Sequence, residues 1–70
     1  MFKVGDFIKC KRKFGIIQDV YENGRYICIS HNGMKPCSFS AAEDELKKIT
    51  KEQFIAWIKR SGYTSMYSYF

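Results

Sequence analysis

Short runs in which apolar and polar side chains alternate fill the first 40 positions of the chain. In residues 6–11, Ile8 and Cys10 fall on one side and Phe7 and Lys9 on the other, which is the period of a half-buried β-strand. Three further short runs follow, at residues 16–21, 25–30 and 34–39. We therefore predict a meander of short antiparallel strands.

The segments between these runs have the composition of tight turns. Asn23-Gly24 favours a two-residue type I′ turn, because both central residues of that turn need a positive φ. Asn32-Gly33 repeats the signal one strand later. Pro36 lacks a backbone donor, which places its run at a sheet edge or at a strand end. Such a meander is expected to curl into an open barrel, which hides both faces of a short sheet.

The alternation of apolar and polar residues that is typical of a strand ends at Ser40. Ser40 to Glu43 matches a capping box, in which the serine hydroxyl and the glutamate carboxylate satisfy free backbone N–H groups. We therefore predict a short helical turn that leads to Leu46 and Ile49.

A helix of about ten residues is predicted after Thr50. Thr50 to Gln53 is a second capping box. Phe54, Trp57 and Ile58 then follow at helical spacing and form an apolar stripe that docks the helix on the sheet. Ser61-Gly62 is the predicted end of the helix.

The length and composition limit the fold to one small domain. The chain has 70 residues, of which 46% are hydrophobic. Chains carry roughly one domain per 100–200 residues, and so short a chain encloses no large substrate cleft. We expect a β-barrel over residues 1–49, with a C-terminal helix and aromatic tail over residues 50–70 packed on the same domain.

The sequence shows no recognisable catalytic constellation. His31 is the only histidine, and no nucleophile and orienting carboxylate surround it in a known pattern. The glycines fit turns and a helix cap rather than a phosphate-binding loop. We predict a protein that is not an enzyme and needs no cofactor.

The three cysteines, Cys10, Cys28 and Cys37, cannot all pair. Together with His31 they match the ligand count of a Cys3His zinc site. Cys10 and Cys28 lie within apolar runs, however, so reduced, buried thiols without a metal are the favoured interpretation. The chain has no apolar run of signal-peptide length and none near the roughly 20 residues of a membrane span, so we expect a cytoplasmic protein that does not bind membranes.

The opening of the chain resembles small SH3-like barrels of the KOW and Tudor-like type. Val4-Gly5-Asp6-Phe7-Ile8 is similar to their first strand, and Gly15-Ile16-Ile17-Gln18-Asp19-Val20 to their second. The segment from Phe39 to Ile49 is similar to their closing helical turn and last strand. The resemblance covers about residues 3–49 and implies a binding module for RNA, DNA or peptide, with no catalytic residues.

Positive charge is concentrated in the strand region. Residues 1–40 carry seven basic and three acidic side chains, a net +4 of the +5 of the whole chain. Phosphates need several hydrogen-bonding cations, and unpaired bases also use aromatic platforms. The predicted nucleic-acid-binding residues are Lys9, Lys11, Arg12, Lys13, Phe14, Arg25 and Lys35. The alternative is a solvated rim whose lysines only protect the sheet edge from aggregation.

A protein-binding module is the second hypothesis. The tail has no charge and is rich in aromatic residues, which are frequent anchors of protein interfaces. Its candidate interface residues are Tyr63, Met66, Tyr67, Tyr69 and Phe70. In size and composition the chain resembles the small accessory proteins that bacteriophages and mobile elements encode to inhibit or redirect a host protein. Under this hypothesis the basic rim, formed by the basic residues named above, contacts an acidic protein surface in the host cytoplasm. Alternatively, the tail joins two copies of the chain in a homodimer.

Overall fold

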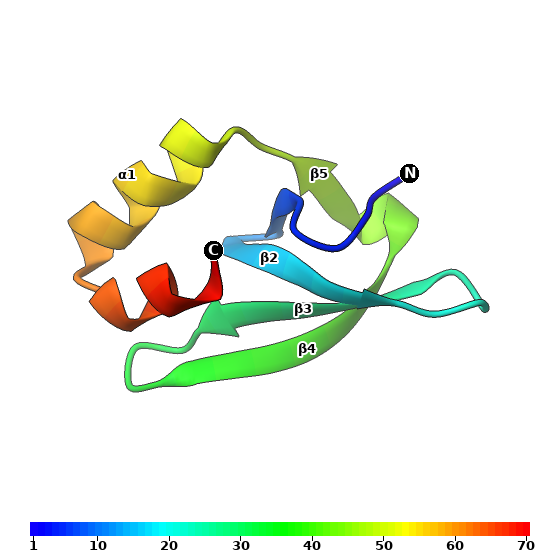
Figure 1. Cartoon of the computed structure of the whole chain (residues 1–70), viewed down its shortest axis with the longest axis horizontal. Coiled ribbons are helices and arrows are strands. Elements are labelled where there is room, and N and C mark those ends of the chain that lie inside the picture. Colours follow the sequence, from blue (N-terminus) through cyan, green and yellow to red (C-terminus); the bar gives the residue numbers. More distant parts are fainter.

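The computed structural model describes residues 1–70 and is mainly β, with five antiparallel strands in one open sheet, one α-helix and two 3-10 turns (Figure 1). The strands are β1 (Phe7–Cys10), β2 (Lys13–Val20), β3 (Arg25–His31), β4 (Pro36–Ala42) and β5 (Leu46–Lys48). The remaining elements are η1 (Glu43–Glu45), α1 (Lys51–Ser61) and η2 (Thr64–Tyr69).

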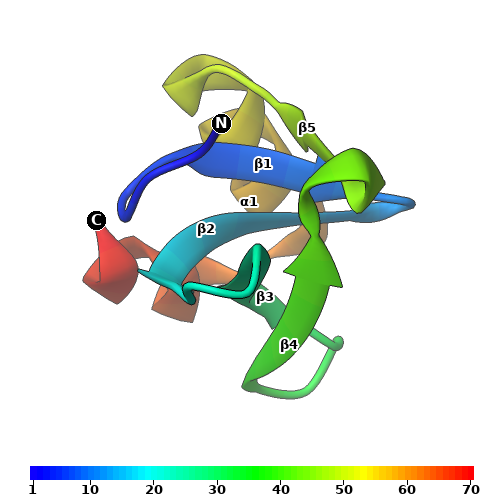
Figure 2. The same ribbon diagram turned by 90° about the vertical axis from the view of Figure 1, so that its right-hand side faces the viewer.

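The sheet has the strand order β4-β3-β2-β1-β5. The first four strands form the predicted meander, and β5 returns to pair with β1, with Cys10 opposite Leu46. β4 and β5 each pair with one neighbour only, so the strongly curled sheet stays open between them (Figure 2). The predicted fold class is therefore confirmed as a mainly β sheet with a C-terminal helix, and the sheet does not close into a barrel.

The β2–β3 hairpin is confirmed, but its predicted type I′ turn is wrong. Only Gly24 has a positive φ, of 82°, and Asn23 does not. The Tyr21 carbonyl accepts from Gly24 N at 3.1 Å, and the Tyr21 N–H donates to the Arg25 carbonyl at 2.8 Å. The loop therefore has three residues and ends in a left-handed glycine, which is the usual alternative to the two-residue turn. The Asn32-Gly33 turn and the edge position of Pro36 are as predicted.

The predicted capping box at Ser40 is also wrong. The β3–β4 ladder continues as far as the pair Arg25–Ala42, so Ser40 is still a strand residue. The 3-10 turn begins at Ala42 instead, where Glu45 Oε1 accepts from Ala42 N at 2.7 Å. Cross-strand pairing, which the local sequence does not show, displaced the start of the turn by two residues.

The predicted caps of α1 are confirmed at both ends. Thr50 Oγ1 accepts from Gln53 N at 3.1 Å, and Gln53 Oε1 accepts from Thr50 N at 2.8 Å. Gly62 ends the helix in the left-handed conformation, with φ 78°. With its 11 residues, the helix is neither long nor apolar enough to cross a membrane.

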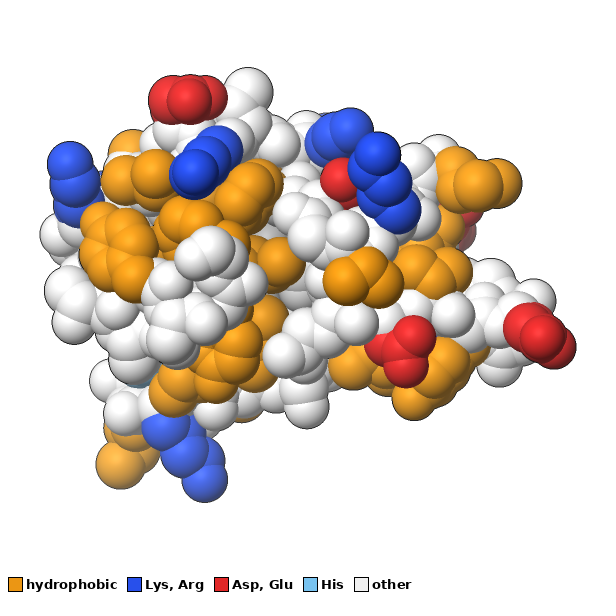
Figure 3. Space-filling model, in the orientation of Figure 1, with side chains coloured by type: hydrophobic (Ala, Val, Ile, Leu, Met, Phe, Trp, Pro, Cys, Tyr) orange, Lys and Arg blue, Asp and Glu red, His pale blue; other side chains and the backbone are white.

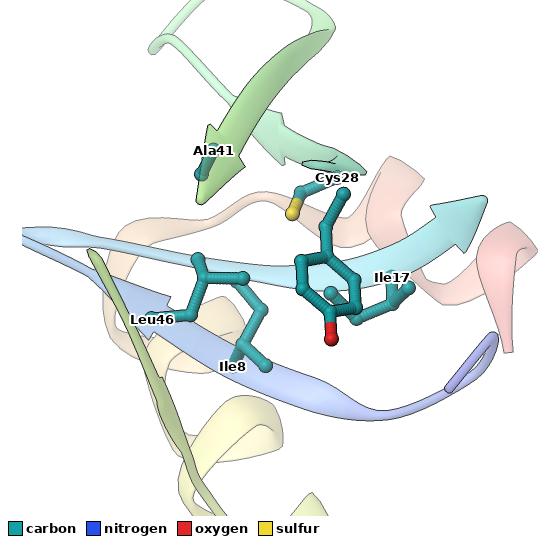
Figure 4. Packing of buried hydrophobic residues seen from close by; sticks show 6 residues of the cluster. Ile8, Ile17, Cys28, Ala41 and Leu46 are labelled. Carbon is teal, nitrogen blue, oxygen red and sulfur yellow. The ribbon is translucent and has the colours of Figure 1, made fainter. Parts of the chain in front are cut away.

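The sheet has a hydrophobic cluster on each face. The inner cluster takes at least one side chain from every strand, and five of its members are labelled in Figure 4. It consists of Ile8, Ile17, Tyr26, Cys28, Ala41 and Leu46. The outer cluster joins the other face to the helix and η2, and consists of Ile16, Ile29, Phe54, Trp57, Ile58 and Met66. Both faces of this short sheet are thus covered, which a 70-residue chain needs for stability.

Candidate nucleic-acid interface

The basic segment after β1 forms a tight hairpin tip. Cys10 pairs with Lys13, and Lys11 and Arg12 are the only residues between them. Lys11 has φ 56°, which makes it the only non-glycine residue with a positive φ. Arg12 does not have a positive φ, and a two-residue turn with positive φ at the first central position alone normally has glycine there. The backbone at Lys11 is therefore strained, and its side chain stands at the tip of the hairpin.

A groove of about 440 Å³ lies beside the hairpin tip. We call it the basic groove; its lining residues are Cys10, Lys11, Arg12, Lys13, Phe39, Ser40 and Glu45. They come from the β1–β2 hairpin, from β4 and from η1, which lie next to one another at this corner of the sheet (Figure 2). The groove forms where the tip of the β1–β2 hairpin meets β4 and η1.

Phe39 provides the aromatic surface of the basic groove. It is half-buried and packs against the inner cluster, so its position is fixed from one side. The ammonium Nζ of Lys13 lies over its ring, 5.8 Å from the centroid. Sequence reasoning missed this residue, because only the curling of the sheet brings β4 to the hairpin tip.

The cations of the basic groove have no acidic partner. The chain has two ion pairs, Met1–Glu43 and Lys48–Asp6, and neither involves a groove residue. Glu45 also lines the groove, but none of the three cations lies within ion-pair distance of it, and its Oε1 is used by the Ala42 N–H. The net charge of the lining side chains is +2, and the three positive charges are free to meet an anion.

Two further lysines add positive charge next to the hairpin. Lys9 of β1 lies directly opposite Lys47 of β5, and both side chains are exposed without an acidic partner. Like charges at directly opposed positions destabilise a sheet. The pair is on the outer face of the sheet, where the Lys9 ammonium lies over the Phe14 ring, and neither lysine lines the groove. Lys47 was not among the predicted residues.

Phe14 lies apart from the basic groove, because it is not among the residues that line it. Its ring stacks on Trp57, with 5.6 Å between centroids and 11° between planes. The ammonium of Lys9 lies over the same ring, 5.6 Å from its centroid. Both residues belong to the outer, helix-covered face of the sheet, where Phe14 packs against the outer cluster.

The remaining predicted residues divide into one near the groove and one apart from it. Arg25 Nε donates to the hydroxyl of Ser40, a groove residue, at 3.2 Å. Lys35 is exposed in the β3–β4 turn and does not line the groove. Of the seven predicted residues, the structure thus gathers Lys11, Arg12 and Lys13 in one site.

The cysteines and His31 do not converge on one point. No group of three or more His, Cys, Asp or Glu side chains is placed to hold a metal ion. All three cysteines are free thiols, and His31 stacks on Tyr63 with 4.1 Å between ring centroids. Burial, with a smaller effect of Cys10, raises the pKa of Cys28 to about 11, so this thiol stays protonated at neutral pH.

Glu43, the first residue of η1, has a structural role outside the groove. Its carboxylate accepts hydrogen bonds from the N-terminal amine at 3.1 Å and from the Tyr26 hydroxyl at 3.0 Å. These two hydrogen bonds, in that order, lower the pKa of Glu43. The interaction closes the end of the inner cluster, where Phe2 packs edge-on against Tyr26.

The aromatic tail is partly core and partly surface. Met66 is fully buried in the outer cluster, and Tyr63 packs against that cluster. Tyr67, Tyr69 and Phe70 remain 39%, 39% and 43% exposed. Figure 3 shows hydrophobic side chains gathered on the side of the molecule where α1 and η2 lie.

Comparison of the chain with protein-family models, with curated proteins and with solved structures gives no match. The functional argument therefore rests on the groove and its charges.

Proposed function

We propose that the protein is a non-catalytic binding module that holds nucleic acid in the basic groove. The observation that carries this proposal is the set of three unpaired cations, Lys11, Arg12 and Lys13, at the edge of a groove with an aromatic ring. Phosphate backbones bind to dispersed cations of this kind and release counterions. One further feature supports an anionic ligand, namely the strained backbone at Lys11.

We further infer that the fold is an incompletely closed relative of the SH3-like barrels. The pairing of β5 with β1 and the 3-10 turn between β4 and β5 support this inference. These are the closing elements of the sequence pattern that the chain shares with such barrels.

Salt-dependent binding tests the proposal. Fluorescence anisotropy measures the affinity for short labelled single-stranded and duplex oligonucleotides, of DNA and of RNA, between about 50 and 200 mM salt. The variant Lys11→Gln/Arg12→Gln/Lys13→Gln is compared with Lys3→Gln/Lys59→Gln/Arg60→Gln. The second variant loses the same charge at exposed positions outside the groove.

Loss of the groove cations is expected to weaken binding and to flatten its salt dependence. Each phosphate contact contributes about 0.7 to the slope of log K against log salt for a single strand, so the groove variant should lose about 2. The control variant should keep most of the wild-type slope. Equal effects of the two variants would show that only the net charge matters.

Binding to an acidic protein surface is the second candidate function. The partly exposed aromatic rings of Tyr67 and Tyr69 favour it, because they offer apolar anchors, whereas Phe70 packs edge-on against Phe7 and Phe54. Truncating the tail is not a suitable test, since it would remove the buried Met66. Tyr67→Ser/Tyr69→Ser leaves the core in place. Polyglutamate serves as the acidic probe, and polyglutamate binding that weakens in both this variant and the groove variant, while oligonucleotides do not bind, would favour this second function.

A further inference from the structure

We propose that the basic groove is a subsite for one unpaired nucleotide, with the base against the Phe39 ring and the phosphate held by Lys11, Arg12 and Lys13. This inference rests on the proposed nucleic-acid function and narrows it to single-stranded ligands. The shape, the energetics and the charge distribution of the groove each support it.

The groove is concave and small. Its volume of about 440 Å³ is in the lower half of the roughly 300–1,000 Å³ range of small-molecule sites. A duplex presents a convex surface with its bases stacked inside, and a groove of this size reaches no base of it. A single strand turns its bases outward, and one of them fits between the hairpin tip and β4.

A nucleotide base can replace the Lys13 ammonium on the face of the Phe39 ring. The Lys13 ammonium is 5.8 Å from the ring centroid, near the outer limit of a cation–π contact, and the side chain is exposed. An exposed cation–π contact of this kind is weak, and the stacking of a base on an aromatic ring is the stronger interaction. Stacking therefore displaces Lys13 from the ring, and the released ammonium becomes available to the phosphate.

Glu45 favours a nucleotide over an acidic peptide. A carboxylate side chain that enters the groove meets the negative charge of Glu45 as well as the three cations. A nucleotide separates its negative phosphate from an uncharged base. Carboxylates accept hydrogen bonds from exocyclic base amines, as in their contacts with cytosine N4. Glu45 is therefore expected to favour cytosine or adenine over uracil or thymine.

The test compares variants of Phe39 in binding to single strands and to the duplex of the same sequence. Phe39→Leu keeps an apolar side chain against the inner cluster but removes the ring, and Phe39→Trp keeps a ring. Loss of stacking should weaken single-strand binding by about fivefold to a hundredfold. Phe39→Trp should retain wild-type affinity, and duplex affinity should be the same in all three proteins. Thermal unfolding of each variant verifies that it is folded.

The base preference has its own control. Glu45→Gln keeps an oxygen acceptor for the Ala42 N–H, as Gln53 does in the α1 cap. It should reduce the preference of oligo(dC) over oligo(dT) without weakening oligo(dT) binding.

Three results would overturn the nucleotide subsite. They are equal affinity of the Leu and Trp variants for single strands, tighter binding of duplex than of single strand, and binding of polyglutamate as tight as that of oligo(dC). If single strands and duplex bind with a salt slope that depends on Lys11, Arg12 and Lys13 but not on Phe39, only the subsite is wrong. If no oligonucleotide binds at low salt, the proposed function itself is wrong.

Discussion

Lys11 provides a prediction in which stability and binding change in opposite directions. Its φ of 56° puts an L-residue in the left-handed region, which costs about 1–2 kcal/mol. Glycine adopts this conformation freely, although its greater freedom in the unfolded chain offsets part of the gain. We expect Lys11→Gly to raise the free energy of unfolding by about 1 kcal/mol, which shifts Tm upward by roughly 4–8 °C in a domain of this size.

Two control variants separate backbone strain from charge in this experiment. Lys11→Gln removes the charge but keeps the strain, so its Tm should equal that of the wild type. Lys9→Gly places a glycine in regular strand β1, where it should destabilise by about 0.5–1 kcal/mol. Thermal unfolding followed by circular dichroism measures all four proteins at one pH and salt concentration.

Binding of the same proteins completes the test. Lys11→Gly and Lys11→Gln each lose one groove cation, so both should bind a single-stranded oligonucleotide more weakly, and to the same extent. The more stable protein would then be the weaker binder, as expected when strain is retained at a functional site. A Tm of Lys11→Gly at or below the wild-type value would refute the strain argument. Wild-type affinity in Lys11→Gln would refute a role of Lys11 in binding.

Three further predictions concern the fold. An added Cβ at Gly15 would lie 2.6 Å from the backbone oxygen of Ile29. Gly15→Ala should therefore lower the free energy of unfolding by about 2 kcal/mol or more, as measured by urea unfolding. A wild-type unfolding midpoint would contradict the close approach of the two strands. The pKa of Cys28 is raised from 9.0 to about 11, so the folded state binds the thiol proton more tightly. The stability that this proton provides is complete below pH 9 and is lost as the pH rises towards 11. Between pH 9 and pH 11, the free energy of unfolding of Cys28→Ala should therefore fall by less than that of the wild type. Equal losses in the two proteins would contradict a buried thiol at this position. Met66→Ala should lower the free energy of unfolding by about 2–5 kcal/mol, and Tyr69→Ala by about 0.5 kcal/mol or less, as measured by thermal unfolding. Similar losses in the two variants would contradict the division of the tail into core and surface residues.

Local signals in the sequence predicted local structure well. The Thr50 capping box, the apolar stripe of α1 and the Gly62 cap are confirmed because they depend on residues within one or two helical turns. The turn at Asn23-Gly24 was located correctly but assigned the wrong type. Its dipeptide also suits a three-residue loop with a left-handed glycine, and the register of the flanking strands decides between the two.

Non-local pairing accounts for what the sequence did not predict. Ser40 has the sequence environment of a helix cap, yet the β3–β4 ladder holds it in a strand. The basic hairpin was recognised from its charge, but its neighbours Phe39 and Glu45 are distant in the sequence and meet it only because the sheet curls. Phe14 was selected because it adjoins the lysines, and its ring instead stacks on Trp57 of the helix. A cluster of charges can be recognised in the sequence, whereas the residues that line a groove are brought together only by the fold.

The salt dependence of single-strand binding is the most direct test of the central claim. We predict that wild-type affinity falls steeply between about 50 and 200 mM salt, and that Lys11→Gln/Arg12→Gln/Lys13→Gln lowers the slope of log K against log salt by about 2. The control variant Lys3→Gln/Lys59→Gln/Arg60→Gln should keep most of that slope. An affinity that does not depend on salt, or a slope that the groove variant leaves unchanged, would contradict a phosphate-binding groove.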